Sequence, residues 1–207
     1  MFLKTLVVGS ISTNCYLVGC PETHEGAVID PGAEEERILA AVRAAGLTIR
    51  FIINTHGHID HIGANGAVKD ATGAAILIHK DDAACLAEPE RNLSTLMGAR
   101  VSSPAADRLL QEGDTISIGR TINLKVIHTP GHTPGGICLK GEDLVFTGDT
   151  LFAGSIGRTD FPGGSFSQLI NAVKEKLFTL DDGLKIYPGH GPASTIGAER
   201  AGNPFFD

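Results

Sequence analysis

The chain has 207 residues, enough for one domain with a sizeable core, and its 42% hydrophobic and 20% charged residues are ordinary for a soluble globular protein. Its formal net charge of -7 and the lack of any basic run argue against a nucleic-acid partner, while a local basic pocket for a small acidic substrate stays open. No apolar run approaches the roughly 18–20 residues that a membrane span needs, so we expect no membrane partner.

The amino-terminal stretch and the cysteines indicate the compartment. Residues 1–9 lack a charged head followed by a long apolar core, so we interpret them as a strand rather than a signal peptide. The cysteines are scattered without a C-x-x-C pair, which fits buried, reduced thiols; they are Cys15, Cys20, Cys85 and Cys138. A Cys15–Cys20 link is the less favoured alternative. We therefore predict a cytoplasmic protein.

Short apolar runs bounded by Gly, Pro, Asn or Ser predict strands in the first half of the chain. They cover residues 2–8, 14–18, 26–30, 51–54 and 74–79. The first three resemble an antiparallel opening. Apolar residues at helical spacing predict a helix over 34–45 that ends at Gly46. Shorter helical segments follow at 65–72, with Asn65 as a candidate cap, and at 81–86 and 91–97.

The second half continues with hairpins and one longer helix. Residues 98–113 show no regular pattern, and we expect them to form either a loop or a lid near the site. Hairpins are predicted for 115–118 with 121–127 and for 137–140 with 144–147. Ser165 has capping-box spacing to Gln168, opening a helix to about residue 177, and 185–187 form a final strand. Strands and helices in both halves predict an α/β protein, with two sheets and helices outside them.

The stretch 54–61 holds four side chains of metal-ligand type within six positions. They are His56, His58, Asp60 and His61. A buried strand precedes them and Gly57 breaks it, so we expect the ligands on a loop at the strand's carboxyl end, where α/β proteins carry their sites. Imidazole and carboxylate without thiolate suit Zn, Fe or Mn rather than a structural zinc finger. The alternative, a histidine-rich surface turn that arose by chance, is disfavoured by this density.

Three later turns repeat one design, a ligand-type residue beside Gly or Pro at the end of a strand. They carry His132, Asp149 and His190. Each turn is weak evidence alone, because glycine is common in turns for conformational reasons. Together with the first motif they supply seven ligands, which suits two divalent metal ions with a carboxylate bridge.

The combined pattern, H-x-H-x-D-H followed by distant His, Asp and His, resembles the signature of the metallo-β-lactamase superfamily. The resemblance spans nearly the whole chain. It implies a single domain over residues 1–207, folded as a four-layer αβ/βα sandwich. The implied ligands of the first metal are His56, His58 and His132. Those of the second are Asp60, His61 and His190, with Asp149 as the bridge.

Within that superfamily the chain is similar to short, glyoxalase II-like hydroxyacylglutathione hydrolases. Aspartate stands at the bridging position 149, where class B β-lactamases often have cysteine, and the segments TNCYL at 13–17 and GRTDFPGG at 157–164 also match. Full-length glyoxalase II enzymes add a carboxyl-terminal helical domain that contacts glutathione, whereas this chain ends at Asp207. The resemblance implies hydrolysis of a small-molecule thioester such as S-lactoylglutathione and leaves glutathione specificity open.

The residues suit attack of a metal-bridging hydroxide on a thioester. A water held between two divalent ions loses its proton near neutral pH, and a thiolate leaving group, whose thiol has a pKa of about 8.5, needs little help from a general acid. The two candidate catalytic residues are aspartates. Asp60 would hold the hydroxide, and Asp149 would bridge the ions. Arg158 is a candidate for a substrate carboxylate, or instead pairs with Asp160. Weaker substrate candidates are Arg200 and Asn203.

Two other functions stay open, and the sequence predicts no oligomeric state. Residues 157–161, 199–200 and 203–204 also resemble persulfide dioxygenases, which would use one iron ion on His56, His132 and Asp149. The forms of 161–164 and 188–191 favour the hydrolase. A non-catalytic module that binds metal structurally is the third reading, and seven intact ligands argue against it.

Overall fold

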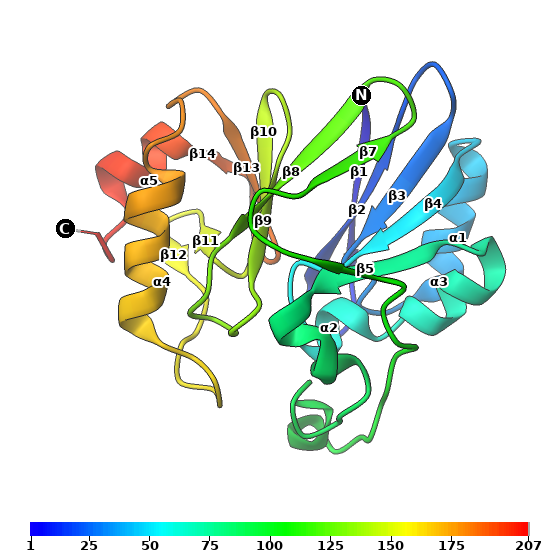
Figure 1. Cartoon of the computed structure of the whole chain (residues 1–207), viewed down its shortest axis with the longest axis horizontal. Coiled ribbons are helices and arrows are strands. Elements are labelled where there is room, and N and C mark those ends of the chain that lie inside the picture. Colours follow the sequence, from blue (N-terminus) through cyan, green and yellow to red (C-terminus); the bar gives the residue numbers. More distant parts are fainter. Residues whose placement is uncertain (207) are drawn as a thin grey trace.

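The computed structural model describes residues 1–206 and shows two β-sheets face to face, with helices on both outer faces (Figure 1). In the first sheet the strands lie side by side in sequence order. They are β1 (Phe2–Val8), β2 (Thr13–Gly19), β3 (Glu25–Ile29), β4 (Thr48–Ile53), β5 (Ala75–His79) and β6 (Arg108–Leu110). The first three are antiparallel, which confirms the predicted opening, and β3 to β6 run parallel.

The second sheet has the order β14-β13-β10-β9-β8-β7. Its strands are β7 (Thr115–Ile118), β8 (Ile122–His128), β9 (Ile137–Lys140), β10 (Leu144–Gly148), β13 (Lys185–Pro188) and β14 (Ser194–Thr195). Both predicted hairpins are confirmed, as β7–β8 and β9–β10. β10 and β13 are parallel, so both end at the same edge of the sheet. A small ribbon, β11 (Leu151–Phe152) and β12 (Ser155–Ile156), follows β10.

Helices cover the outer face of each sheet. On the first sheet lie α1 (Glu35–Ala44) and α3 (Asn65–Thr72), and on the second lie α4 (Phe166–Ala172) with the π-helical turn Val173–Leu177, and α5 (Ile196–Gly202). Three apolar clusters fill the spaces, one between the sheets and one under each helical layer. Within β4, Ile52 packs under the helices and Ile53 between the sheets, which explains the unbroken apolar run of this strand. The predicted four-layer αβ/βα sandwich is thereby confirmed.

The structure corrects several local predictions. Asp60 and His61 lie on a short helix, α2 (Ile59–Ile62), rather than on a loop. β6 falls inside 98–113, which was expected to be irregular, and 3-10 turns (Lys80–Leu86 and Ser94–Met97) replace the two weak helices. Ser165 does cap α4 by accepting a hydrogen bond from Gln168 N. Asn65 does not cap α3, because its side chain bonds across to Asn54 instead.

Two further expectations concern the cysteines and the membrane. All four cysteines are buried free thiols, as expected, and Cys15 and Cys20 are not linked. Over residues 1–206, no helix combines the length and the apolar character that crossing a membrane requires.

Candidate metal centre

The seven predicted ligand residues come from both sheets, and the structure brings them to one place. The first sheet supplies four of them just after β4, namely His56, His58, Asp60 and His61. The second sheet supplies three, after β8, β10 and β13, namely His132, Asp149 and His190. The centre therefore joins the two halves of the sandwich at the edge where these strands end.

Asp149 lies at the middle of the cluster. Its Oδ1 is 3.4 Å from Nε2 of His61, and its Oδ2 is 3.5 Å from Nε2 of both His132 and His190. In residues 1–206, four sets of side chains each place one ligand atom per residue within 4.8 Å of the others, and three of these sets lie at this centre. These three are His56 with His58 and His132, His56 with His61 and Asp149, and Asp60 with His61 and His190.

Buried ligand atoms without hydrogen-bond partners test whether these residues fit a metal. Within residues 1–206 the unpaired buried atoms include His56 Nε2, His61 Nε2, His132 Nε2 and Asp149 Oδ1. Buried polar atoms in proteins are nearly always paired, so orphaned atoms that converge on one point fit a site for metal ions. A donor set of imidazole and carboxylate suits Zn, Fe or Mn.

The other nitrogen of several histidines is held by protein groups. His132 Nδ1 lies 2.6 Å from the carbonyl oxygen of Arg158, and His190 Nδ1 lies 3.2 Å from that of Ile11. His61 Nδ1 lies within ion-pair distance, 3.0 Å, of Oδ2 of the buried Asp30, although it has no hydrogen-bond partner. Each contact turns Nε2 towards the centre, the arrangement by which outer partners orient metal-binding histidines.

Asp30 and Asp82 are buried carboxylates that sequence reasoning missed. Asp30 accepts hydrogen bonds from the backbone N and Oγ1 of Thr55, beside His56. Asp82 accepts hydrogen bonds from Gly57 N (2.9 Å), Thr133 Oγ1 (2.7 Å) and Gly135 N (2.6 Å). Asp82 therefore ties the loop of His56 and His58 to the loop of His132. Asp30 directly follows β3, which is the one sequence signal for its role, whereas Asp82 lies within the 3-10 turn after β5 and has no such signal.

The ligand groups differ in their electrostatics. Burial, together with the neighbouring imidazoles, lowers the pKa of His56 and brings that of His58 to about 3. Burial also disfavours a charge on His61 and His190, but the carboxylates of Asp60 and Asp149 outweigh it and raise the pKa of both imidazoles. Burial opposes ionisation of Asp60 as well, yet contacts with His61 and His190 hold its pKa far below the ordinary range.

A cavity of about 480 Å³ opens onto the centre. Asp60, Asp149 and three of the histidines form its polar side. Its other side is apolar and comprises Ile11, Ile59, Leu93, Leu96, Met97, Phe152, Ile156 and Phe161. Arg158 also lines the cavity. Leu96 and Met97 belong to the 3-10 turn that precedes residues 98–113, and none of the residues 98–113, which were expected near the site, lines this cavity.

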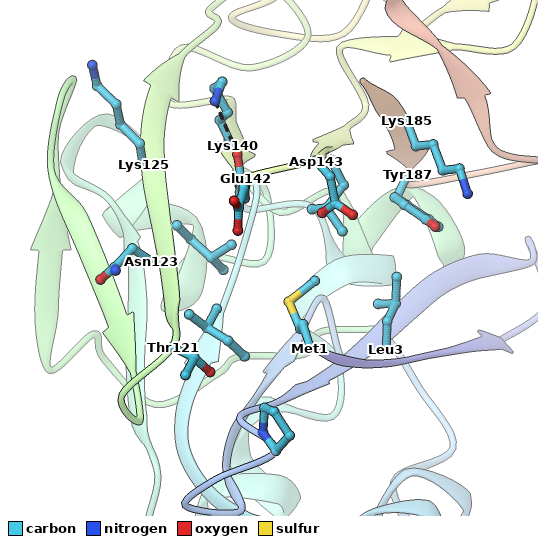
Figure 2. Close-up of a pocket in the computed structure, with 15 residues that line it drawn as sticks. Met1, Leu3, Thr121, Asn123, Lys125, Lys140, Glu142, Asp143, Lys185 and Tyr187 are labelled. Carbon is cyan, nitrogen blue, oxygen red and sulfur yellow. Dashed lines mark hydrogen bonds between the residues drawn. The ribbon is translucent and has the colours of Figure 1, made fainter. Parts of the chain in front are cut away.

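A larger cavity of about 840 Å³ lies at the other end of the strands (Figure 2). It is lined by Leu144 and Lys185, which begin β10 and β13, whereas Asp149 and His190 follow the ends of these strands. Figure 2 shows Lys125 and Lys140 on one side of it and Met1 and Leu3 on the other. Because it contains none of the seven residues, the smaller cavity is the candidate for the chemistry.

The three predicted substrate residues have different surroundings. Arg158 donates two hydrogen bonds to Asp160 (2.9 and 2.6 Å) and lies 4.2 Å from the ring centre of Phe161. Arg200 binds the carboxylate of Asp182 and the carbonyl of Phe178, away from the cavity. Asn203 is buried and donates to backbone carbonyls of the β11–β12 ribbon. The structure therefore brings Arg158 to the cavity and leaves Arg200 and Asn203 outside it.

Comparison with known proteins agrees with this geometry. Residues 8–190 match the metallo-beta-lactamase superfamily. Hydroxyacylglutathione hydrolase GloC of Haemophilus influenzae is 36% identical over 217 residues, which cover 100% of this chain and 99% of that protein. The crystal structure of BLEG-1 B3 metallo-beta-lactamase is similar with a TM-score of 0.94 and 35% identity, covering 99% of both chains. That of ETHE1 from Myxococcus xanthus has a TM-score of 0.83 and 34% identity, covering 99% of this chain and 84% of that one.

These three proteins have different names, so the likeness identifies fold and family rather than substrate. The match spans far more than half of the sequence, and the structures superpose over nearly the whole chain. The chain belongs to the metallo-beta-lactamase superfamily.

Proposed function

We propose that this protein is a hydrolase of small-molecule thioesters that works with two divalent metal ions. One observation carries the proposal. In residues 1–206, every His and Asp that lines the cavity beside the centre belongs to a candidate metal-binding set, and the one other charged side chain there, Arg158, is paired with Asp160. The cavity thus offers metal ligands but no uncommitted acid.

The leaving group decides which bond such a site can cleave. Hydrolysis of an amide or a lactam expels an amine that must be protonated, so it calls for a general acid. A thioester expels a thiolate, which is stable without one because a thiol pKa is only about 8.5. The name of the Haemophilus influenzae relative, a hydroxyacylglutathione hydrolase, supports this choice.

His56, His58 and His132 would hold one ion, and Asp60, His61 and His190 the other, with Asp149 between them. Zn, Fe and Mn all suit these ligands. When bound, two such cations lower the pKa of a water, from 15.7 to about 7 in the single-zinc precedent, and polarise a carbonyl.

Asp60 would orient the attacking water. Its Oδ2 accepts a hydrogen bond from Thr13 Oγ1 (2.9 Å) and lies 3.1 Å and 3.2 Å from Nε2 of His61 and His190. Its depressed pKa keeps it a carboxylate, able to accept a hydrogen bond from water. The water oxygen bonds to the acyl carbon, the C–S bond breaks, and the sulfur leaves with the bonding electrons. The products are a carboxylate and a thiol, with one proton released to solvent.

The test is thiol release from S-lactoylglutathione under anaerobic conditions by protein loaded separately with Zn, Fe or Mn. Asp149→Asn should lower turnover by about 100-fold or more, since even outer partners of metal ligands are worth 10–100-fold. Asp143→Asn is the matched control, because Asp143 is exposed at the distant cavity. Metal content is measured for each variant.

Absence of thiol release with every metal would exclude a hydrolase of this thioester. Full activity of Asp149→Asn with two ions bound would remove the bridging role. Oxygen uptake by iron-loaded protein on glutathione persulfide would establish the dioxygenase instead, the other reaction that the sequence motifs resemble.

A further inference from the structure

The apolar side of the cavity points to the substrate. It is formed by segments from five parts of the chain, which surround one another only after folding. Ile11 comes from the β1–β2 turn, Ile59 from α2, Leu93, Leu96 and Met97 from the 3-10 turn and the residue before it, Phe152 and Ile156 from the β11–β12 ribbon, and Phe161 from the loop before α4. An apolar wall gathered from distant segments beside a polar centre is the usual composition of a site for an organic ligand.

Three of these side chains are exposed to water at the mouth of the cavity. Leu96 is 69% exposed, Met97 53% and Ile11 49%. Clustered exposed apolar groups mark binding surfaces, because water leaves them favourably when a ligand covers them. They line the same cavity as Asp60 and Asp149, so a group that covers them is part of the molecule that reacts there.

The turn that carries Leu96 and Met97 is held in place by hydrogen bonds of Asn92, which precedes it. The side chain of Asn92 donates hydrogen bonds to the carbonyls of Cys85 (3.0 Å) and Val101 (2.9 Å), and its Oδ1 accepts one from Ser94 N. The backbone carbonyl of Asn92 also accepts a hydrogen bond from Ile59 N, next to His58. These hydrogen bonds of Asn92 fix the turn to the segment that carries His58. Leu96 and Met97 are therefore held beside the site.

The cationic side chain at the cavity is already paired with a carboxylate. Arg158 is its one Lys or Arg side chain in the part of the chain that the structure describes, and both of its hydrogen bonds to Asp160 are in place. Its guanidinium also lies over the ring of Phe161. An anionic substrate group that bound Arg158 would therefore have to displace Asp160, whereas an apolar group would leave this ion pair intact.

We propose that the site prefers thioesters whose acyl group is bulky and apolar, such as an aromatic hydroxyacyl group, over the small lactoyl group. This inference rests on the proposed thioester hydrolysis. The acyl group would lie against Leu96, Met97 and Ile11 with its carbonyl at Asp60 and Asp149. The reaction balances as before, with water adding to the acyl carbon and the thiol leaving.

The experiment compares two substrates with the same thiol carrier and the same hydroxyacyl carbon. S-mandeloylglutathione has a phenyl ring where S-lactoylglutathione has a methyl group. We expect the metal-loaded protein to show at least a 10-fold higher kcat/KM on the mandeloyl thioester, after division by the ratio of the two rates with free hydroxide. The double variant Leu96→Ser with Met97→Ser should bring this ratio close to 1.

Leu109→Ser is the matched control, because Leu109 is also 53% exposed but lies on β6 and outside the cavity. It should leave the ratio unchanged. A parent ratio of 1 or below, or a ratio that the double variant does not lower, overturns the preference while lactoyl hydrolysis keeps the proposed function. Failure to cleave either thioester overturns both.

Discussion

The pKa values of the histidines at this centre are shifted in opposite directions. His56 and His58 are surrounded by other imidazoles, which together with burial lower their pKa. Carboxylates surround His61 and His190 and raise theirs, against the effect of burial. A proton and a metal ion compete for the same nitrogen lone pair, so the two candidate ion positions differ in their resistance to acid.

Acidification should therefore release the two ions in order. Groups with a raised pKa bind protons at a higher pH, so the ion held by Asp60, His61 and His190 should leave first. The ion held through His56 and His58 should leave at a lower pH. Metal content of desalted protein, measured from pH 8 to pH 4, should fall in two steps of one equivalent. His190→Ala should abolish only the first step and His58→Ala only the second; release of both ions in one step would contradict this expectation.

Asp82 gives a second prediction at the scale of one residue. Its two oxygens accept hydrogen bonds from Gly57 N, Thr133 Oγ1 and Gly135 N. Asp82→Asn keeps the shape of the side chain but replaces one accepting oxygen with an NH2 group. That group donates hydrogen bonds and would face the donors that Asp82 now accepts from. We expect a loss of metal affinity of about 10–100-fold, as for other outer partners of ligands. Competition with a chelator measures it, and the exposed neighbour in Asp81→Asn is the control.

An unchanged affinity in Asp82→Asn would show that the two ligand loops are held by other contacts. A loss in Asp81→Asn of the same size would assign the effect to the 3-10 turn as a whole rather than to the buried carboxylate.

At the scale of elements, the segment after β13 approaches the centre as closely as its backbone allows. A Cβ at Gly189 would collide with Oδ1 of Asp149 and lie 2.8 Å from Cε1 of His61. Gly189→Ala should displace the carboxylate, so that the protein retains one ion or none and loses activity while its circular dichroism stays native. In Gly202→Ala the added Cβ meets nothing within 4 Å, so this variant should keep both ions. Two ions bound by Gly189→Ala would refute the argument.

Strands and helices could be predicted from the sequence where they are long enough to show a hydrophobic period. β4 and the β7–β8 hairpin were found because strands of four to seven residues show an apolar run or an alternation. β6 and β14 have three and two residues, too few for any period, and they exist because neighbouring strands complete their hydrogen bonds. α5 is short and rich in Gly and Ala, and Ile196 alone anchors it deeply in the outer core.

At the scale of the whole molecule, the candidate ligands join the two sheets. Four lie after β4 of the first sheet and three lie after strands of the second. Ions bound to both sets would cross-link the halves and stabilise only the folded chain.

Removal of the metal should therefore lower the melting temperature. A free ion at 100 times its Kd contributes about 2.7 kcal/mol, and each kcal/mol moves Tm by about 2–4 °C in a chain of 150–250 residues. Chelation should lower Tm by roughly 5–11 °C per tightly bound ion, as measured by calorimetry with and without EDTA. The effect should shrink in Asp149→Asn and persist in Asp143→Asn. Equal Tm values for loaded and metal-free protein would show that the ions do not link the sheets.

Local sequence determined the fold class and the identity of the seven clustered residues. Each follows a strand whose end is marked by an apolar run and a subsequent Gly or Pro, and parallel neighbours bring such ends to one edge. Their geometry agrees with two metal sites, and the assignment of each ligand to an ion stays a prediction.

Only the tertiary structure decided what surrounds those residues. Thr13 reaches Asp60 across 47 positions and Thr133 reaches Asp82 across 51. Arg158 faces the cavity but is already paired, while Arg200 and Asn203 point elsewhere. Periodicity records which face of an element is buried, whereas these contacts depend on how two sheets pack together, which no local pattern encodes.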